Sequence, residues 1–263
     1  MRAPPVRFTE VGGEHVAYQV VGDSDRWGMA LTSWLASVDG QWEDPEHLRI
    51  WRTCRAAGAR VIHLDHRGLG GSDPVPLDRL ADLDDWVDDV AAVLDAEEIE
   101  RVPIMAEAEQ VPVAVRFATR FPDRVERLVF PHPWIRPPWG DEVVELIRQR
   151  WGTGEVLRSM GWNGDLDFLG RTERLAAPRG VASRLLPAFS RWDVSGDIPN
   201  VQAECLVLSV IGGPAPEQGV DLASALPNAQ LVEVRPTGRY WGDRMFERIL
   251  EFFGFEAATG ERR

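Results

Sequence analysis

The sequence predicts an α/β fold in which an eight-stranded, mostly parallel sheet has helices on both faces. Short apolar runs, typical of buried strands, alternate with longer segments whose apolar residues recur with the period of a helix. A helix-rich stretch broken by glycines and prolines interrupts this alternation once. We therefore expect a single domain with a core at about residues 1–134 and 199–254, a helical lid at about 135–198 and a frayed tail at 255–263.

The first part of the chain should form five strands and two helices. A Gly12-Gly13 pair predicts a hairpin turn between the first two strands. Asp44 followed by Pro45 predicts a helix that reaches about residue 57, because aspartate caps a helix and proline fits its first turn. Apolar residues on one side and acids on the other predict a second helix over 82–99. The expected strands are residues 6–10, 15–21, 29–33, 60–65 and 102–106.

The rest of the chain continues the same pattern on both sides of the interruption. Val111, Val115 and Ala118 lie on one stripe and predict a helix directly after the fifth strand. A turn and a buried strand ending at Phe130 follow. Helices are expected at residues 142–151, 172–177 and 181–189, then strands at 204–211 and 230–235 and helices at 217–226 and 242–253.

Composition excludes several classes of partner and cofactor. The net charge of −13 argues against a nucleic-acid partner or an anionic membrane, which require a basic face. No run approaches a membrane span and the N-terminus lacks a signal peptide's apolar core, so we expect a soluble, cytoplasmic monomer or homodimer. All 29 basic residues are arginine, which excludes a Schiff-base lysine. Cys54 and Cys205 form no metal-ligand spacing, and we expect no metal and no cofactor.

Several segments resemble the α/β-hydrolase superfamily, and in particular the hydrolase-like domains found beside adenylate cyclase modules. In chain order they read VAYQVVGD, QWEDP, LDHRGLGGSD, FATRFPDRVERLV, WGTGEVL and TERLAAPRG. The resemblance extends over nearly the whole chain. It implies the α/β-hydrolase fold, with a sharp strand–turn–helix elbow that begins after residue 105.

The same resemblance implies a Ser-His-Asp triad, and this chain departs from it at all three positions. The elbow, Gly-x-Ser-x-Gly in the superfamily, here reads AEAEQ at residues 106–110, so Ala108 stands at the serine position. Gly212-Gly213 stands where the acid is usual, and no histidine follows His132. We therefore expect no serine-type hydrolysis. Because both elbow glycines are replaced, we also expect a relaxed elbow.

Three candidate catalytic residues should meet at the carboxyl ends of the strands, under the lid. Glu107 would be a buried carboxyl group with a raised pKa, able to act as base or acid; the alternative is pairing with an arginine behind the turn. His132, between two prolines, can titrate near neutrality or be purely structural. Tyr240 replaces the missing histidine and can polarise a carbonyl group, or can be a surface-loop residue.

Further residues are predicted to bind the substrate. Trp34 follows the third strand and would offer a flat stacking face. Glu109 is expected to be mainly structural, and its backbone N–H can also donate to an oxyanion. Arg239 can hold an anion or can be a surface-loop residue. Gln110 is expected among the polar groups of the pocket. Tryptophan walls would suit a large planar aromatic ligand, unless most tryptophans serve packing. The predicted set is Ser33, Trp34, Ala108, Glu109, Trp134, Trp139 and Arg239.

Two functions are compatible with these features. The first is a non-hydrolytic enzyme that uses pocket shape and acid–base groups to add, cyclise or isomerise an aromatic or polycyclic metabolite. Its reactions would include carbon–carbon bond formation in secondary metabolism. The second is a ligand-binding or sensor protein without catalysis. The new polar groups of the pocket favour the first, because simple loss of activity requires no glutamate.

Overall fold

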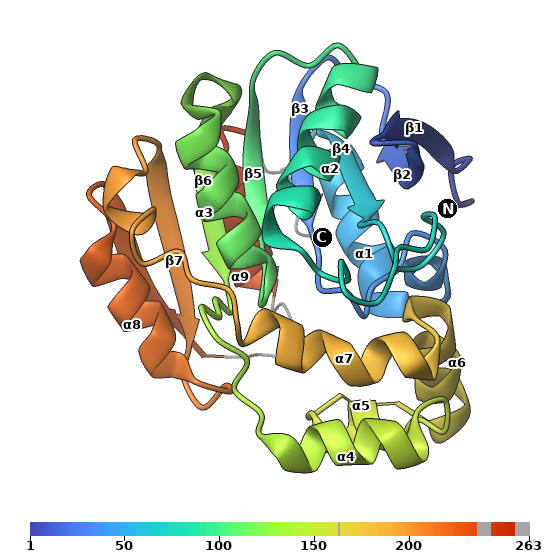
Figure 1. Cartoon of the computed structure of the whole chain (residues 1–263). Coiled ribbons are helices and arrows are strands. Elements are labelled where there is room, and N and C mark those ends of the chain that lie inside the picture. The colour runs from blue at the N-terminus through green and yellow to red at the C-terminus, as the bar shows by residue number, and fades with distance from the viewer. Residues whose placement is uncertain (163, 236–242, 256–263) are drawn as a thin grey trace, which may run out of the picture.

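The computed structural model describes residues 1–162, 164–235 and 243–255. The strands are β1 (Arg7–Val11), β2 (Glu14–Val21), β3 (Trp27–Leu31), β4 (Arg60–Asp65), β5 (Val102–Ala106), β6 (Val125–Pro131), β7 (Glu204–Val210) and β8 (Ala229–Val234). They form one sheet in the order β1-β2-β4-β3-β5-β6-β7-β8 (Figure 1). The β1–β2 hairpin joins β4 antiparallel, and all pairs from β4 to β8 are parallel. The predicted eight-stranded, mostly parallel sheet is confirmed.

Helices cover both faces of the sheet and form two separate apolar layers. One layer contains α1 (Pro45–Ala56) and α9 (Asp243–Phe252); the other contains α2 (Leu83–Ala96), α3 (Gln110–Arg120) and α8 (Pro216–Ala225). As predicted, Asp44 caps α1 by accepting from the amide of Glu46. Short 3₁₀ turns occur at Gly40–Glu43, Pro122–Arg124 and Ile198–Asn200. No helix within the described ranges is long and apolar enough to cross a bilayer.

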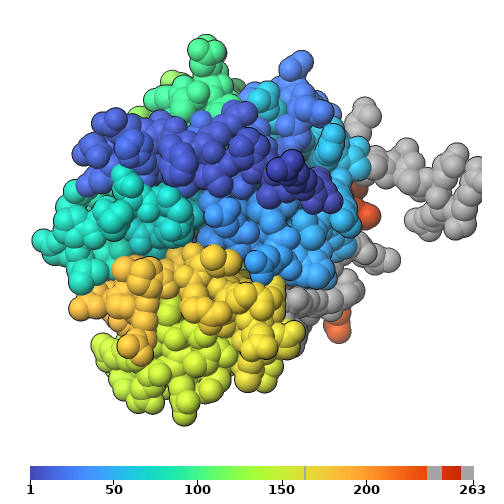
Figure 2. All heavy atoms as spheres, turned by 90° about the vertical axis from the view of Figure 1, so that its right-hand side faces the viewer, coloured from blue at the N-terminus to red at the C-terminus, as the bar shows by residue number. Residues whose placement is uncertain are grey.

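Four helices are inserted between β6 and β7. They are α4 (Asp141–Arg150), α5 (Glu155–Ser159), α6 (Leu166–Ala176) and α7 (Arg179–Phe189). They lie together at one end of the molecule, below the N-terminal half of the chain (Figures 1 and 2). The sequence did not predict α5, and α6 begins six residues before the predicted 172–177. The division into core, lid and tail stays a prediction.

A buried carboxylate fixes the α5–α6 part of this insertion. Glu173 on α6 is fully buried and accepts from the amides of Gly152, Gly154 (3.0 Å) and Leu157 (3.1 Å). Gly154 has φ +84, and a Cβ there would lie 2.5 Å from the carbonyl oxygen of Leu166. Glycine is therefore required for the loop to approach α6 closely enough for these bonds.

Glu173→Ala should lower the free energy of unfolding by roughly 3 kcal/mol, because three amides lose their carboxyl acceptor in a buried site. Denaturant unfolding measures this change. The matched control is Glu145→Ala on the exposed side of α4, where a change within about 0.5 kcal/mol is expected. Equal effects of the two substitutions would show that the clamp contributes nothing specific.

Candidate active site

A sharp elbow is retained at the end of β5. Ala108 has φ +52, a conformation rare for any residue with a Cβ. Its amide donates to the carbonyl oxygen of His132 (3.1 Å), and its own carbonyl accepts from Trp134 N (3.2 Å). The prediction of a relaxed elbow is therefore wrong, because bonds from the chain after β6 hold the turn without the two glycines. The side chain at the tip of this elbow is the methyl group of Ala108.

The two residues flanking Ala108 turn their carboxyl groups to the loop after β3. Ser33 N donates to Glu107 Oε1 (2.8 Å), and Trp34 N donates to Glu109 Oε1 (2.7 Å). Among the described residues, Glu107 pairs with the Ser33 amide and not with an arginine, so the alternative prediction is wrong. In the α/β-hydrolase pattern, an amide of this loop helps to bind the oxyanion. Here the chain's own carboxyl groups occupy these donors.

Burial favours the acid forms of both carboxyl groups. It raises the pKa of Glu109 to about 8, against the opposing effect of the amides of Trp34 and of Glu109 itself, and the charge on Glu107 raises it further. Burial also raises the pKa of Glu107, opposed by the Ser33 amide and by positive charge on His47. The elbow thus holds two carboxyl groups that resist ionisation.

Glu109 should make stability depend on pH. Above about pH 4.3 the unfolded chain loses this proton, while the folded chain keeps it until about pH 8. The free energy of unfolding therefore falls as pH rises across this window, by up to about 1.4 kcal/mol per pH unit. Glu109→Gln should make the fall less steep, as measured by denaturant unfolding at a series of pH values. Glu126→Gln at an exposed site is the control; identical slopes for all three proteins would contradict a raised pKa at Glu109.

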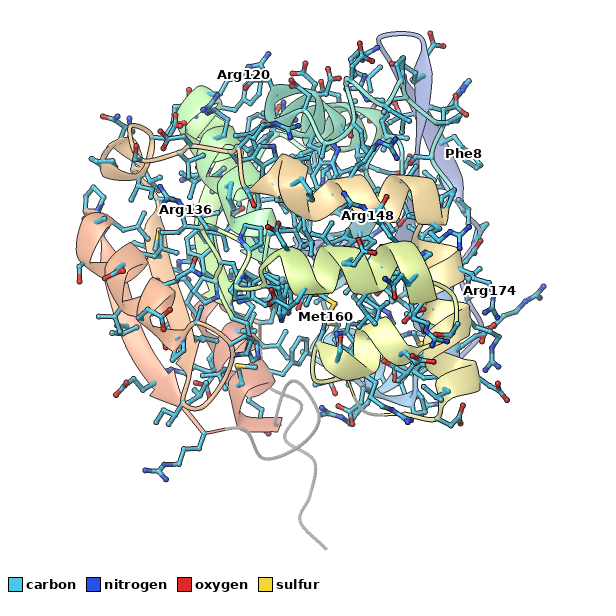
Figure 3. The ribbon with its side chains drawn as sticks, turned by 60° about the horizontal axis from the view of Figure 1, so that its bottom comes forward. Phe8, Arg120, Arg136, Arg148, Met160 and Arg174 are labelled. Carbon is cyan, nitrogen blue, oxygen red and sulfur yellow. The ribbon has the colours of Figure 1, made fainter. Side chains whose placement is uncertain are left out.

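A cavity of about 340 Å³ lies between the strand ends and the insertion. The insertion contributes Met160 and Trp162 to the wall of this cavity. Met160 lies near the middle of the insertion (Figure 3). The ring centroids of Trp134 and Trp139 are 4.6 Å apart in an edge-to-face arrangement. The predicted tryptophan-walled cavity is therefore present. Of the predicted site residues it brings together Ser33, Glu107, Ala108, His132, Trp134 and Trp139.

Other predicted site residues lie elsewhere. Trp34 is buried and stacks on Trp151 of the insertion at 5.3 Å, so the prediction that it faces a ligand is wrong. Gln110 is also wrongly placed in the pocket: it is buried, and its Oε1 lies 3.0 Å from Nε2 of His66. Glu109 reaches the β3 loop and is absent from the cavity wall among the described residues. The predictions for Arg239 and Tyr240 lie outside the described residues.

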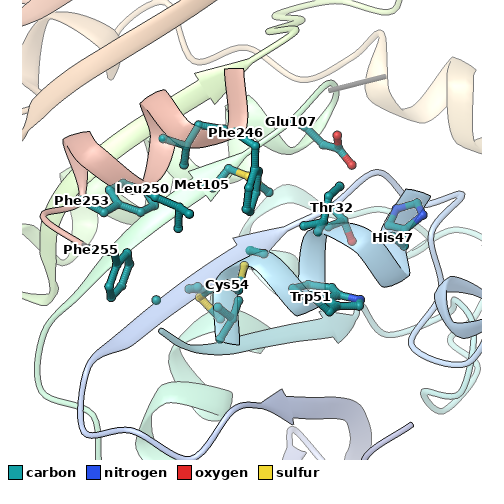
Figure 4. A pocket seen from close by; sticks show the side chains of 16 residues that line it. Thr32, His47, Trp51, Cys54, Met105, Glu107, Phe246, Leu250, Phe253 and Phe255 are labelled. Carbon is teal, nitrogen blue, oxygen red and sulfur yellow. The ribbon is translucent and has the colours of Figure 1, made fainter. Parts of the chain in front are cut away.

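His47 on α1 is a site residue that the sequence analysis missed. It lines the cavity, and its Nδ1 lies 2.9 Å from Asp44 Oδ2, one helical turn earlier. A carboxylate accepts only, so Nδ1 donates to it and Nε2 carries the lone pair. Figure 4 shows His47 and the carboxyl group of Glu107 at one end of a second, narrow space that both residues also line. The Asp44-x-x-His47 spacing at a helix start was the available signal.

The described residues offer no obvious site for a metal or a reactive thiol. Within them, no group of three His, Cys, Asp or Glu side chains could hold a metal ion. Cys54 and Cys205 are buried, and burial raises the pKa of each thiol to about 12. Thiols of this kind are inert toward substrates. The polar groups available to chemistry are therefore those of the cavity.

Comparisons with known proteins agree with this architecture. No family model matches the chain. A 2-hydroxymuconate semialdehyde hydrolase from Pseudomonas sp. (strain CF600) is 40% identical over 74 residues, which are 28% of this chain and 26% of that protein. This match thus spans about a quarter of the relative's length.

Solved structures match over nearly the whole chain. The enol-lactonase from Burkholderia xenovorans LB400 has a TM-score of 0.74 at 20% identity, covering 94% of this chain and 100% of that one. The meta-cleavage product hydrolase from Pseudomonas fluorescens IP01 has a TM-score of 0.72 at 22% identity, covering 94% and 97%. The chain has the α/β-hydrolase fold, as the sequence predicted.

These names contradict the functional prediction. The sequence analysis expected a non-hydrolytic enzyme or, as its alternative, a binding protein without catalysis, whereas the similar proteins are named as hydrolases. The prediction rested on the absence of the serine, the histidine and the acid that the resemblance implies. Loss of a nucleophilic side chain removes a covalent intermediate, but an activated water molecule can attack a carbonyl carbon directly.

Proposed function

We propose that the chain hydrolyses a small carbonyl compound by direct attack of water, with His47 as general base and Glu107 as the acid that binds the carbonyl oxygen. The observation that carries the proposal is the meeting of these two oriented groups at one cavity. Asp44 fixes His47 through Nδ1, and the Ser33 amide fixes Glu107 through Oε1. Groups held in this way lose little freedom when a substrate binds.

The orientation of His47 suits it to take a proton from water. Its Nδ1 is engaged by the Asp44 carboxylate, which leaves Nε2 as the basic nitrogen. Asp44 is itself held, because its other oxygen accepts from the amide of Glu46 at 3.0 Å. An acid–histidine pair of this kind stabilises the imidazolium that forms as the proton is taken.

Glu107 can donate the hydrogen bond to the carbonyl oxygen, because the backbone amides of Ser33 and Trp34 already donate to carboxyl groups of the chain. Its raised pKa favours the carboxylic acid, and its Oε1 accepts from Ser33, so the acid O–H is left for a ligand. A neutral carboxylic acid in an apolar site can donate a hydrogen bond to a carbonyl oxygen that gains negative charge. We assign Glu107 this role, and we assign His132, which lines the same cavity, to binding the leaving group while His47 protonates it.

The steps balance without a covalent enzyme intermediate. Water attacks the carbonyl carbon while His47 Nε2 takes one proton, and the carbonyl oxygen accepts the bonding electron pair and the hydrogen bond from Glu107. When the C=O bond re-forms, the bond to the leaving atom breaks, and His47 returns its proton to that atom. The products are a carboxylic acid and the protonated leaving group. The names of the similar hydrolases, an enol-lactonase among them, support esters and lactones as the first substrates to test.

His47→Ala should lower kcat about 10²–10⁴-fold with little change in binding, because only the base is lost. The measurement is steady-state hydrolysis of p-nitrophenyl acetate and of a simple enol lactone. His15→Ala removes an exposed histidine that is likewise paired with an aspartate, and should leave kcat unchanged. Full activity of the His47 variant would refute its assignment.

Glu107→Gln should change the pH profile of kcat. In the native chain, the rate should fall as pH rises through the raised pKa of Glu107, where the acid form is lost. Glutamine does not ionise, so the variant should lose this fall in rate at high pH. An unchanged fall would assign the alkaline limb to another group.

Turnover should proceed without an acyl-enzyme. Serine-directed phosphonates should leave the mass of the protein unchanged, because Ala108 has no nucleophilic atom. Intact-protein mass spectrometry before and after treatment measures this. A stoichiometric adduct, for example on Ser33 in the cavity wall, would replace the water mechanism with a covalent one.

A further inference from the structure

A narrow second space of about 40 Å³ extends from the active site along the sheet. We call it the slot. It runs between α1, α9 and the strands β3 and β5, and it shares Glu107 and His47 with the cavity (Figure 4). A carbonyl group held between these two residues therefore has the cavity on one side and the slot on the other.

The walls of the slot are apolar along most of its length. Thr32, Glu107 and His47 lie together at one end of it (Figure 4). Among the described residues, Trp51 is a further wall residue with a polar atom, an indole N–H that has no hydrogen-bond partner. The Cys54 thiol behaves as a small apolar group, because burial raises its pKa to about 12. The remaining walls include Ala30, Ile50, Met105, Phe246 and Leu250.

We propose that the slot binds a short, unbranched alkyl arm attached to the carbonyl carbon of the substrate. This proposal rests on the proposed function for the position of the carbonyl group. A slot this small excludes a ring, so the larger substituent lies against Trp134 and Trp139 in the cavity. Burial of each methylene group against apolar walls is favourable, and these walls make up most of the length of the slot.

Gly28 limits the length of this arm. Gly28 on β3 lies at the far end of the slot beside Phe255, Thr32 follows β3 at the polar end, and both Gly28 and Thr32 line the slot. A Cβ at Gly28 would lie 3.6 Å from the ring of Phe255, an ordinary van der Waals contact. Alanine can therefore be accommodated there, and it shortens the slot.

The test is calorimetric binding of phenyl alkyl ketones whose alkyl arm grows from methyl to pentyl. The phenyl ring is too wide for the slot and fixes the orientation. Affinity should rise about fourfold for each methylene group until the slot is full, and then fall. In Gly28→Ala the turning point should come one methylene earlier. Gly196→Ala, where an added Cβ has nothing within 4 Å, should match the native chain.

Two outcomes would contradict the proposal that the slot binds an alkyl arm. One is an affinity that does not depend on arm length; the other is a turning point that Gly28→Ala leaves in place while Ala36→Val, in the cavity wall, moves it. Ketones of this kind are not hydrolysed, so the binding series is independent of turnover. Absence of hydrolysis together with the expected series would therefore reject the proposed reaction and retain the apolar subsite.

Discussion

The hydrogen bonds from the backbone amides of Ser33 and Trp34 to Glu107 and Glu109 are the interaction on which the site depends. Each bond gives a hydrogen-bond partner to a backbone amide and to a buried carboxyl group. Because Ala108 at the elbow has positive φ, the two glutamates flank it and both reach the loop after β3. The same burial raises the pKa of each carboxyl group, so an acidic O–H can replace the amides that now serve the protein itself. The proposed chemistry depends on the acid O–H of Glu107 as the hydrogen-bond donor, in place of the amides of Ser33 and Trp34.

The sheet could be predicted because its signals are local. Strand–helix alternation, the hairpin glycines and the Asp44 cap depend on neighbouring residues, and each is present in the structure. The insertion was harder to predict. Gly152 and Gly154 interrupt the helical pattern in the sequence, yet their amides bind Glu173 about twenty residues later and order α5. The position of Trp34 could not be predicted for the same reason, because its ring stacks on Trp151, which lies far along the chain.

The site was predictable only where it follows strand ends. Glu107 and His132 come directly after β5 and β6, and parallel strands bring their ends to one edge of the sheet. His47 was missed because it lies on a helix and reaches the cavity through packing of α1. Gln110 was misplaced because its partner, His66, lies 44 residues earlier. Composition of the elbow alone could not reveal that bonds from the chain after β6 keep it sharp, nor could a missing serine decide whether water is activated elsewhere.

The most direct test of this account is the protonation state of Glu107. Carbon-13 NMR of protein with labelled glutamate carboxyl groups, assigned by the Glu107→Gln spectrum, follows its titration in the absence of any substrate. The account predicts that Glu107 keeps its proton well above the ordinary glutamate pKa of about 4.3, because burial outweighs the Ser33 amide and the charge on His47. A Glu107 signal that titrates at the ordinary value, and is therefore that of a carboxylate at neutral pH, would contradict it.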